Sequence, residues 1–218
     1  MPDTKPLAPS PLAEGVTQFQ LDFNEAPPLD ETLLSVLNAW RRILYQRGLN
    51  GRDPARYGGL AYGNVSQKIG SGFAISGTQT GGIPHLSARH YTMVSAFDIE
   101  SNTVRAQGPL PPSSEAMTHG AAYQANPDIQ VVLHAHAPMI WQNADTLDLQ
   151  STEPNIGYGT PAMARAIGRL LSQDPFSVLV MGGHEDGVLA TGRTPSEAAH
   201  RLLDTLARAL ALPPKTPS

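Results

Sequence analysis

Residues 112–138, PSSEAMTHGAAYQANPDIQVVLHAHAP, contain a helix-forming segment followed by an apolar strand that ends in two histidines. Neighbouring side chains of a strand point to opposite faces, so His134 and His136 are expected on the same face. Two imidazoles at the end of one strand form half of a possible metal site. The alternative is that these histidines cap the strand or form hydrogen bonds within the core.

The helix-forming segment places a carboxylate near a helix terminus. Ser113 can act as the N-cap, which puts Glu115 in the first turn, where the helix dipole favours an ionised carboxylate. The free N–H groups of such a helix start can also bind an anion. Glu115 and His119 are four residues apart and should share a helix face. The alternative for Glu115 is an ordinary first-turn acid.

A third histidine lies in the stretch VMGGHEDG, residues 180–187, directly after a predicted strand. The glycines around His184 allow a turn in which this side chain points into a cleft without backbone strain. The alternative is a solvent-exposed loop histidine.

Three small polar segments complete the candidate site: YGNVS (62–66), ISGT (75–78) and PSS (112–114). Each offers hydroxyl groups and backbone N–H groups. Together they could hold a phosphate or a carboxylate without a lysine, although each alone is an ordinary turn sequence.

Composition limits the classes of protein that are possible. The chain has 218 residues, of which 40% are hydrophobic, enough for one sizeable domain. It has no cysteine, so a disulfide framework and a thiolate zinc site are excluded, and a metal would need histidine and oxygen ligands. A net charge of -4 does not favour nucleic acid. No secretory signal or membrane span is recognisable, so we expect a cytoplasmic protein without a membrane partner.

The pattern along the chain predicts a layered α/β fold. Residues 1–28 are proline-rich and are expected to form an arm or tail, residues 29–212 one domain, and residues 213–218 a second tail. A helix should follow Asp30 as its cap and end at Gly48, and the last helix should begin after Thr194. Between them, predicted strands and helices alternate.

The order of the motifs resembles the class II aldolase/adducin family over residues 29–212. In sequence order these are GNVS, SGT, PSSE, HAHAP and a glycine-flanked histidine, and residues 112–138 are the most specific part. The resemblance implies a single three-layer α/β/α domain with a central, largely antiparallel mixed sheet. It also implies a homo-oligomer, typically a tetramer, with active sites at subunit interfaces.

The resemblance also implies roles for individual residues. His134, His136 and His184 would hold a divalent metal, usually Zn²⁺, with Mn²⁺, Co²⁺ or Fe²⁺ as alternatives, and Glu115 would be the catalytic carboxylate. The residues that match the phosphate-binding segments of the family are Gly63, Asn64, Ser76, Gly77, Ser113 and Ser114.

The function implied is that of a lyase that cleaves or forms a C–C bond in a hydroxylated keto compound, expected to be a sugar phosphate. Three neutral imidazoles leave zinc an open position, where a metal can act as a Lewis acid and stabilise an enediolate while Glu115 acts as the base. The alternatives are an epimerase, a dehydratase or a decarboxylase with the same metal site, or a non-catalytic interaction module of the adducin kind.

The family pattern leaves three points undecided in this sequence. Glu185 and Asp186 separate His184 from the next glycine, and we expect them to form a solvated turn; the alternatives are a second acid/base and a clamp on a ligand histidine. Gln79 and His85 could reshape the anion pocket for an unphosphorylated or acidic substrate. The candidates for the tyrosine that donates a proton in the family's aldolases are Tyr158 and Tyr123.

Overall fold

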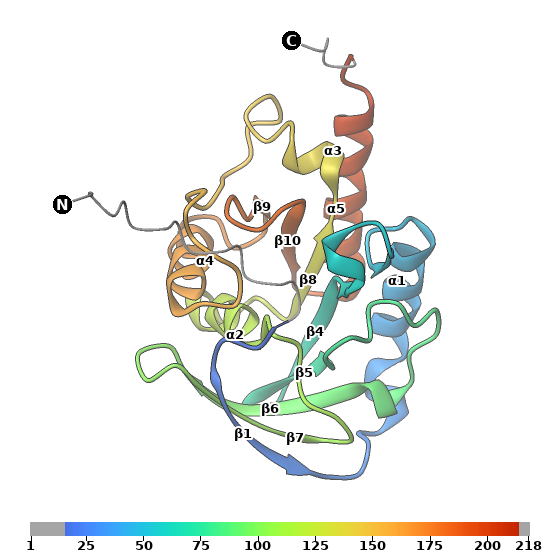
Figure 1. Cartoon of the computed structure of the whole chain (residues 1–218), viewed down its shortest axis with the longest axis vertical. Coiled ribbons are helices and arrows are strands. Elements are labelled where there is room, and N and C mark those ends of the chain that lie inside the picture. Colours follow the sequence, from blue (N-terminus) through green and yellow to red (C-terminus); the bar gives the residue numbers. More distant parts are fainter. Residues whose placement is uncertain (1–15, 214–218) are drawn as a thin grey trace, which may run out of the picture.

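A computed structural model describes residues 16–213, which are built around one eight-stranded sheet (Figure 1). The order of strands across the sheet is β1-β7-β6-β5-β4-β8-β10-β9. β1 pairs with β7 in parallel, and all other neighbours in this sheet are antiparallel, as expected for a largely antiparallel mixed sheet. The strands are β1 (Gln20–Glu25), β4 (Asn64–Ile69), β5 (Gly72–Ser76), β6 (Tyr91–Asp98), β7 (Thr103–Gly108), β8 (Val131–His136), β9 (Val178–Val180) and β10 (Gly187–Gly192).

Two short strands and a set of helices complete the fold. β2 (Gly51–Arg52) and β3 (Ala61–Tyr62) form a separate antiparallel pair. The α-helices are α1 (Ser35–Gln46), α2 (Ala116–Ala125), α3 (Pro138–Trp141), α4 (Pro161–Gln173) and α5 (Pro195–Leu210), and the 3-10 helices are η1 (Glu31–Leu34), η2 (Tyr57–Gly59) and η3 (Ala88–His90).

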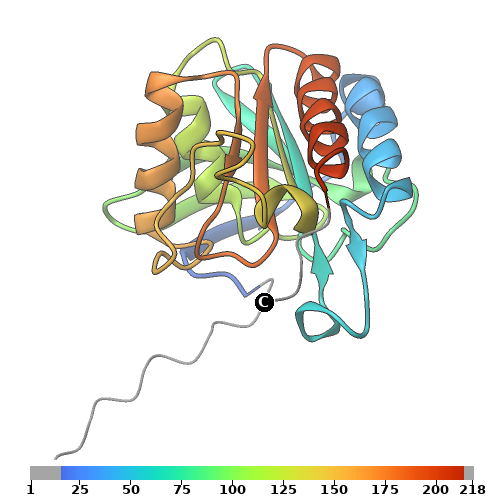
Figure 2. The same ribbon diagram turned by 90° about the horizontal axis from the view of Figure 1, so that it is seen from above.

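Helices lie on both faces of the sheet. Figure 2 shows α2 and α4 on one side of the strands and α1 and α5 on the other. Each pair packs over its own hydrophobic cluster, so the chain forms the α/β fold expected from its sequence.

The two clusters draw alternate residues from the central strand β8. Val131 and Leu133 point to the cluster under α1 and α5, whereas Val132 points to the cluster under α2 and α4. Because side chains alternate along a strand, His134 and His136 lie on the same face as Val132. The histidines therefore leave the sheet on the side of α2, which carries Glu115 at its start.

Several helix ends lie where the sequence predicted them, because a side-chain cap or a glycine defines each one. The carboxylate of Asp30 accepts a hydrogen bond from the Thr32 N–H at 2.9 Å, and Thr194 Oγ1 accepts one from the Glu197 N–H at 3.1 Å. Gly48 has a φ angle of 69° just after α1, in the left-handed region that ends helices.

Two local expectations were wrong. The proline-rich segment contributes β1 to the sheet, so part of residues 1–28 belongs to the fold rather than to an arm. Ser113 is not the N-cap of α2: Glu115 occupies that position, and Ser113 Oγ accepts a hydrogen bond from the Glu115 N–H at 3.3 Å. Residues 1–15, and all but Pro213 of the expected C-terminal tail, lie outside the described residues.

The helices of residues 16–213 include none with the length and apolar character that a bilayer crossing requires.

Candidate metal centre and polar pocket

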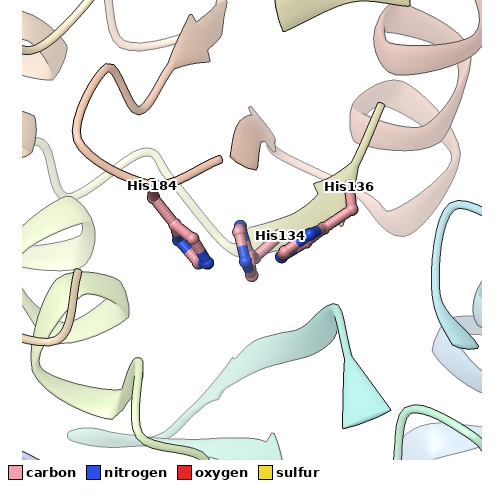
Figure 3. Close-up of side chains that lie close together, drawn as sticks. All are labelled: His134, His136 and His184. Atoms are coloured by element: carbon pink, nitrogen blue, oxygen red, sulfur yellow. The ribbon is translucent and has the colours of Figure 1, made fainter. Parts of the chain in front are cut away.

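Three histidines from two parts of the chain meet at one end of the sheet (Figure 3). His134 and His136 come from β8, and His184 comes from the turn between β9 and β10. β10 pairs with β8 so that Gly187 lies opposite His136, which brings the turn to the end of β8. One ligand atom of each imidazole lies within 4.8 Å of the others, and all three residues are buried. These are the three residues expected to hold a metal.

Burial keeps the two strand histidines neutral. Loss of solvent, followed by the proximity of His184, holds the pKa of His134 well below its ordinary value. Burial and the same neighbour lower the pKa of His136, with a smaller effect from Arg56. A neutral imidazole keeps a lone pair on one ring nitrogen, which is the form that binds a metal.

His134 offers the clearest test of whether a metal fits. Its Nδ1 lies 3.1 Å from the Val188 carbonyl oxygen, so Nδ1 carries the proton and donates it there. Nε2 of His134 is buried and has no hydrogen-bond partner among the described residues. A buried acceptor without a partner is costly, and a metal would satisfy it. The histidine set therefore fits a divalent metal such as zinc.

Glu115 lies beside this cluster. It is 2% exposed, and its Oε1 is 3.7 Å from His184 Nδ1. Its position at the N-cap of α2 places the carboxylate near the positive end of the helix dipole, which favours its ionised form. A buried carboxylate next to three imidazoles can accept a proton or take part in metal binding.

A polar pocket lies next to the histidines and contains most of the residues predicted to bind phosphate. Its lining includes Gly63, Asn64, Gly77, Ser113 and Ser114. Ser76 does not line it, because its Oγ lies within the fold and accepts a hydrogen bond from the Val65 N–H at 3.1 Å.

The remaining lining residues were either missed or only partly anticipated: Ala61, Thr78, Gln79, Thr80 and Gly81. Gln79 lines the pocket, as the sequence suggested, and its Oε1 accepts a hydrogen bond from the Ala61 N–H at 3.0 Å. His85 is exposed and is not a lining residue. No charged side chain lines this pocket within the described residues.

The expectation of a solvated turn at residues 185–186 was wrong for Asp186. Glu185 is exposed, but Asp186 is 6% exposed, and its Oδ2 accepts hydrogen bonds from Arg56 Nη2 at 2.7 Å and from the Tyr57 hydroxyl at 2.6 Å. Both Tyr57 and Asp186 have positive φ angles, 50° and 61°, a strained backbone that occurs at functional sites.

Arg56 and Tyr57 were missed in the sequence. The Tyr57 ring lies 4.4 Å from the His136 ring, measured between centroids, and closes that side of the histidine cluster. Nothing local to the segment DPARYGG signals this contact, because it depends on Asp186, which is 129 residues away from Tyr57.

The two predicted tyrosines have different positions. The Tyr158 ring lies 4.8 Å from the His184 ring, and its hydroxyl accepts a hydrogen bond from the Val16 N–H at 3.3 Å. Tyr123 instead belongs to the core, where its hydroxyl is 2.6 Å from Ser66 Oγ, which in turn is 2.7 Å from His119 Nδ1. Only Tyr158 of this pair therefore contacts the histidine cluster.

Comparison with known proteins places these features in a family. The model of the class II aldolase and adducin N-terminal domain matches residues 53–210. A comparison with curated proteins gave no match.

Solved structures share the fold. L-fuculose-1-phosphate aldolase from Thermus thermophilus superposes with a TM-score of 0.59 and 19% identity, covering 81% of this chain and 90% of that protein. A sugar-phosphate aldolase from Thermotoga maritima gives 0.61 and 13%, covering 86% and 100%. YgbL from Klebsiella pneumoniae, a candidate aldolase/epimerase/decarboxylase, gives 0.62 and 17%, covering 84% and 89%.

At these identities the solved structures show the fold alone, whereas the match to the family model spans most of the chain. The motif order, the sheet and the family match agree, and the chain belongs to the class II aldolase and adducin family.

Proposed function

We propose that the chain is a divalent-metal-dependent lyase of the class II aldolase type. Its substrate would be a hydroxylated keto compound, and the polar pocket favours a sugar phosphate. The observation that carries the proposal is the buried Nε2 of His134, which lacks a hydrogen-bond partner among the described residues within a cluster of three histidines. Membership of the class II aldolase and adducin family supports the same conclusion.

His134, His136 and His184 would hold the metal. Zinc suits three neutral imidazoles, and Mn²⁺, Co²⁺ or Fe²⁺ could occupy the same donor set. When bound, the metal would supply Lewis-acid polarisation of a substrate carbonyl. The Val188 carbonyl would hold the His134 ring in the tautomer that leaves Nε2 available.

Glu115 would act as the base. Its carboxylate lies 3.7 Å from His184 and is shielded from water, so a substrate held beside the histidines would meet it directly. In the cleavage direction Glu115 would take the proton of the substrate hydroxyl next to the bond that breaks. In the reverse direction it would return that proton.

The polar pocket would bind the phosphate and orient the substrate. Ser113 and Ser114 lie two positions and one position before Glu115 in the chain, so the anchor and the base share one segment. Binding one end of the substrate in the pocket would bring its reacting atoms to Glu115 and the metal, which lowers the entropic cost of reaction.

The electron pair of the broken C–C bond would stay on the carbon next to the substrate carbonyl, and that carbon must take up a proton. The Tyr158 hydroxyl, whose ring contacts His184, and the Tyr57 hydroxyl, whose ring contacts His136, are the candidate donors.

Arg56 favours a second candidate reaction. Its guanidinium carbon lies 4.7 Å from the centre of the Tyr57 ring, which contacts His136, and the guanidinium is paired with Asp186 at 2.7 Å. A cation there would suit a substrate with a carboxylate, for which decarboxylation is the alternative. Epimerisation and dehydration would use the same metal and base, and a non-catalytic role would need none of these buried groups.

The family resemblance also supports a homotetramer in the cytoplasm with active sites at subunit interfaces. Light scattering of the purified protein would give its mass in solution. A monomer that turns over substrate would contradict this part of the proposal.

The proposed reaction is tested by screening sugar phosphates and hydroxy-keto acids with the zinc-loaded protein and identifying the products. Glu115→Gln should retain the metal and lose activity by roughly 10²–10⁴-fold, because it removes the base. Glu185→Gln is the matched control, since Glu185 is an exposed carboxylate next to His184, and it should retain activity. Full activity in Glu115→Gln would contradict the assigned base, and release of CO₂ would identify the decarboxylase alternative.

A further inference from the structure

A buried arginine lies behind the polar pocket. Arg41 belongs to α1 and is 2% exposed. Its Nη2 donates hydrogen bonds to the carbonyl oxygens of Thr80 at 3.0 Å and Gly81 at 2.6 Å. Its Nη1 donates to the carbonyls of Ile83 and Pro84. One guanidinium thus holds four carbonyl groups of a single loop.

Burial of the charged Arg41 guanidinium costs free energy, because the group loses its contact with water. A buried cation is normally paired with a carboxylate, but Arg41 forms no ion pair within residues 16–213. Its charge is therefore offset by the four carbonyl dipoles and by the Tyr45 ring, 5.2 Å from the guanidinium carbon, and not by a carboxylate. The planar fork of arginine can reach several carbonyls at once, which the single ammonium of lysine cannot do.

Peptide geometry determines what the loop presents on its opposite side. In a trans peptide the carbonyl of one residue and the N–H of the next point in opposite directions. Because the Thr80 carbonyl points to Arg41, the Gly81 N–H points away from it. Thr80 and Gly81 both line the polar pocket, and the Gly81 N–H has no hydrogen-bond partner among the described residues.

Close packing fixes the loop in this place. A Cβ atom at Gly81 would lie 2.3 Å from the Tyr62 carbonyl oxygen, so only glycine fits there. Within the loop itself, Thr80 Oγ1 donates a hydrogen bond to the Gly77 carbonyl at 2.7 Å. The loop is thus held between Arg41 and the β3 strand, with little freedom to turn its peptide groups.

We propose that Arg41 is a positioning residue of the polar pocket: it orients the Gly81 N–H toward an anionic group of the substrate and supplies positive charge from behind the loop. The ligand chemistry is an anion with several acceptor oxygens, either a phosphate or a carboxylate. This inference rests on the proposed function for the identity of the pocket as a substrate site. It explains how a pocket without a charged lining residue can bind an anion.

Selective labelling allows the Gly81 N–H to be observed directly. The chain contains only two Thr-Gly pairs, Thr80-Gly81 and Thr191-Gly192. Protein labelled with ¹³C at threonine carbonyls and ¹⁵N at glycine therefore gives two carbonyl-coupled amide signals. Gly192 lies at the end of β10, paired with Val131, and serves as an internal control. Inorganic phosphate and acetate are titrated separately into the zinc-loaded protein.

The expected result is a shift of the Gly81 signal that saturates with phosphate or with acetate, while the Gly192 signal stays in place. The titration that saturates at the lower concentration identifies the preferred anion. An unmoved Gly81 signal in both titrations of the wild type would overturn the proposal, whatever the variants do.

Variants of Arg41 distinguish an effect on anion binding from a general effect on folding. Arg41→Met should weaken binding of the preferred anion by at least about tenfold, the equivalent of one charge-assisted hydrogen bond, with unchanged zinc content. Arg41→Lys keeps the charge but cannot hold four carbonyls, so it should shift the Gly81 signal even without anion; it replaces Arg41→Met if that variant does not fold. Arg42→Met, an exposed neighbour on the same helix, should bind as the wild type does.

Anion affinity within twofold of the wild type in a folded Arg41→Met protein would overturn the proposal. That failure is distinct from failure of the proposed function, which depends on the metal and on Glu115. A protein that holds zinc and cleaves substrate, but whose Gly81 N–H ignores anions, would keep the function and lose this inference.

Discussion

Asn64 and His134 lie opposite each other in the antiparallel pairing of β4 with β8. Asn64 lines the polar pocket, and His134 belongs to the histidine cluster. Opposed residues of an antiparallel pair have Cα atoms about 4.5–5.5 Å apart. The pocket and the candidate metal centre are therefore neighbours in the sheet.

This pairing predicts that charge at residue 64 controls anion binding. Asn64→Asp keeps the size of the side chain but adds a negative charge to a pocket whose described lining contains no cationic side chain. We expect the affinity for inorganic phosphate, measured by calorimetry, to fall at least about tenfold, because like charges repel strongly at a buried site. Asn24→Asp makes the same charge change at an exposed position of β1 and should have no effect. Equal affinities in the two variants would argue against the pocket as the anion site.

Asp186 is expected to stabilise the segment that covers His136. Asp186→Asn weakens its hydrogen bonds with Arg56 and Tyr57, and we expect a loss of about 1–2 kcal/mol in the free energy of unfolding, since Arg56 is partly exposed. Tyr57→Phe removes one of the same bonds, so the double variant should lose less than the sum of the single losses. Urea unfolding of the four proteins measures this coupling. Additive losses would show that the two side chains do not act together.

His119 predicts a dependence of stability on pH. Burial lowers the pKa of His119 from 6.5 to about 3 in the folded chain, whereas in the unfolded chain it regains its ordinary value. The unfolded state therefore binds an extra proton below pH 6.5, so this contribution to stability is complete above pH 6.5 and is lost as the pH falls toward 3.

His119→Asn removes this titration and keeps an acceptor for Ser66. Between about pH 6.5 and 4.5, the metal-free wild type should lose roughly 2 kcal/mol more stability than the variant, as measured by urea unfolding at both pH values. Parallel losses in the two proteins would mean that folding does not lower the pKa of His119.

The parts of the fold that depend on local sequence were predictable. Thr194 caps α5 through a bond to Glu197 three residues on, and the alternation in β8 placed His134 and His136 on one face. Such features need only the residues within one turn or one strand. The cap of α2 was misplaced by two residues because Ser113 and Glu115 both suit a helix start.

The features that were missed depend on contacts between distant segments. β1 forms by pairing with β7, whose residues lie more than 80 positions away, and the proline-rich composition around it gave no sign of a strand. Asp186 is buried because Arg56 reaches it from 130 positions away. Arg41 lies on the buried face of an amphipathic helix, and its sequence context does not reveal the four carbonyls that it holds.

The metal content of the purified protein tests the central claim most directly. Elemental analysis of the wild type beside His134→Ala should find close to one equivalent of zinc or another divalent metal per chain in the wild type and little in the variant, and chelation should lower the melting temperature of the wild type alone. Absence of metal from both proteins, even after reconstitution with Zn²⁺, Mn²⁺, Co²⁺ or Fe²⁺, would contradict the proposed lyase and leave the buried histidines without a function.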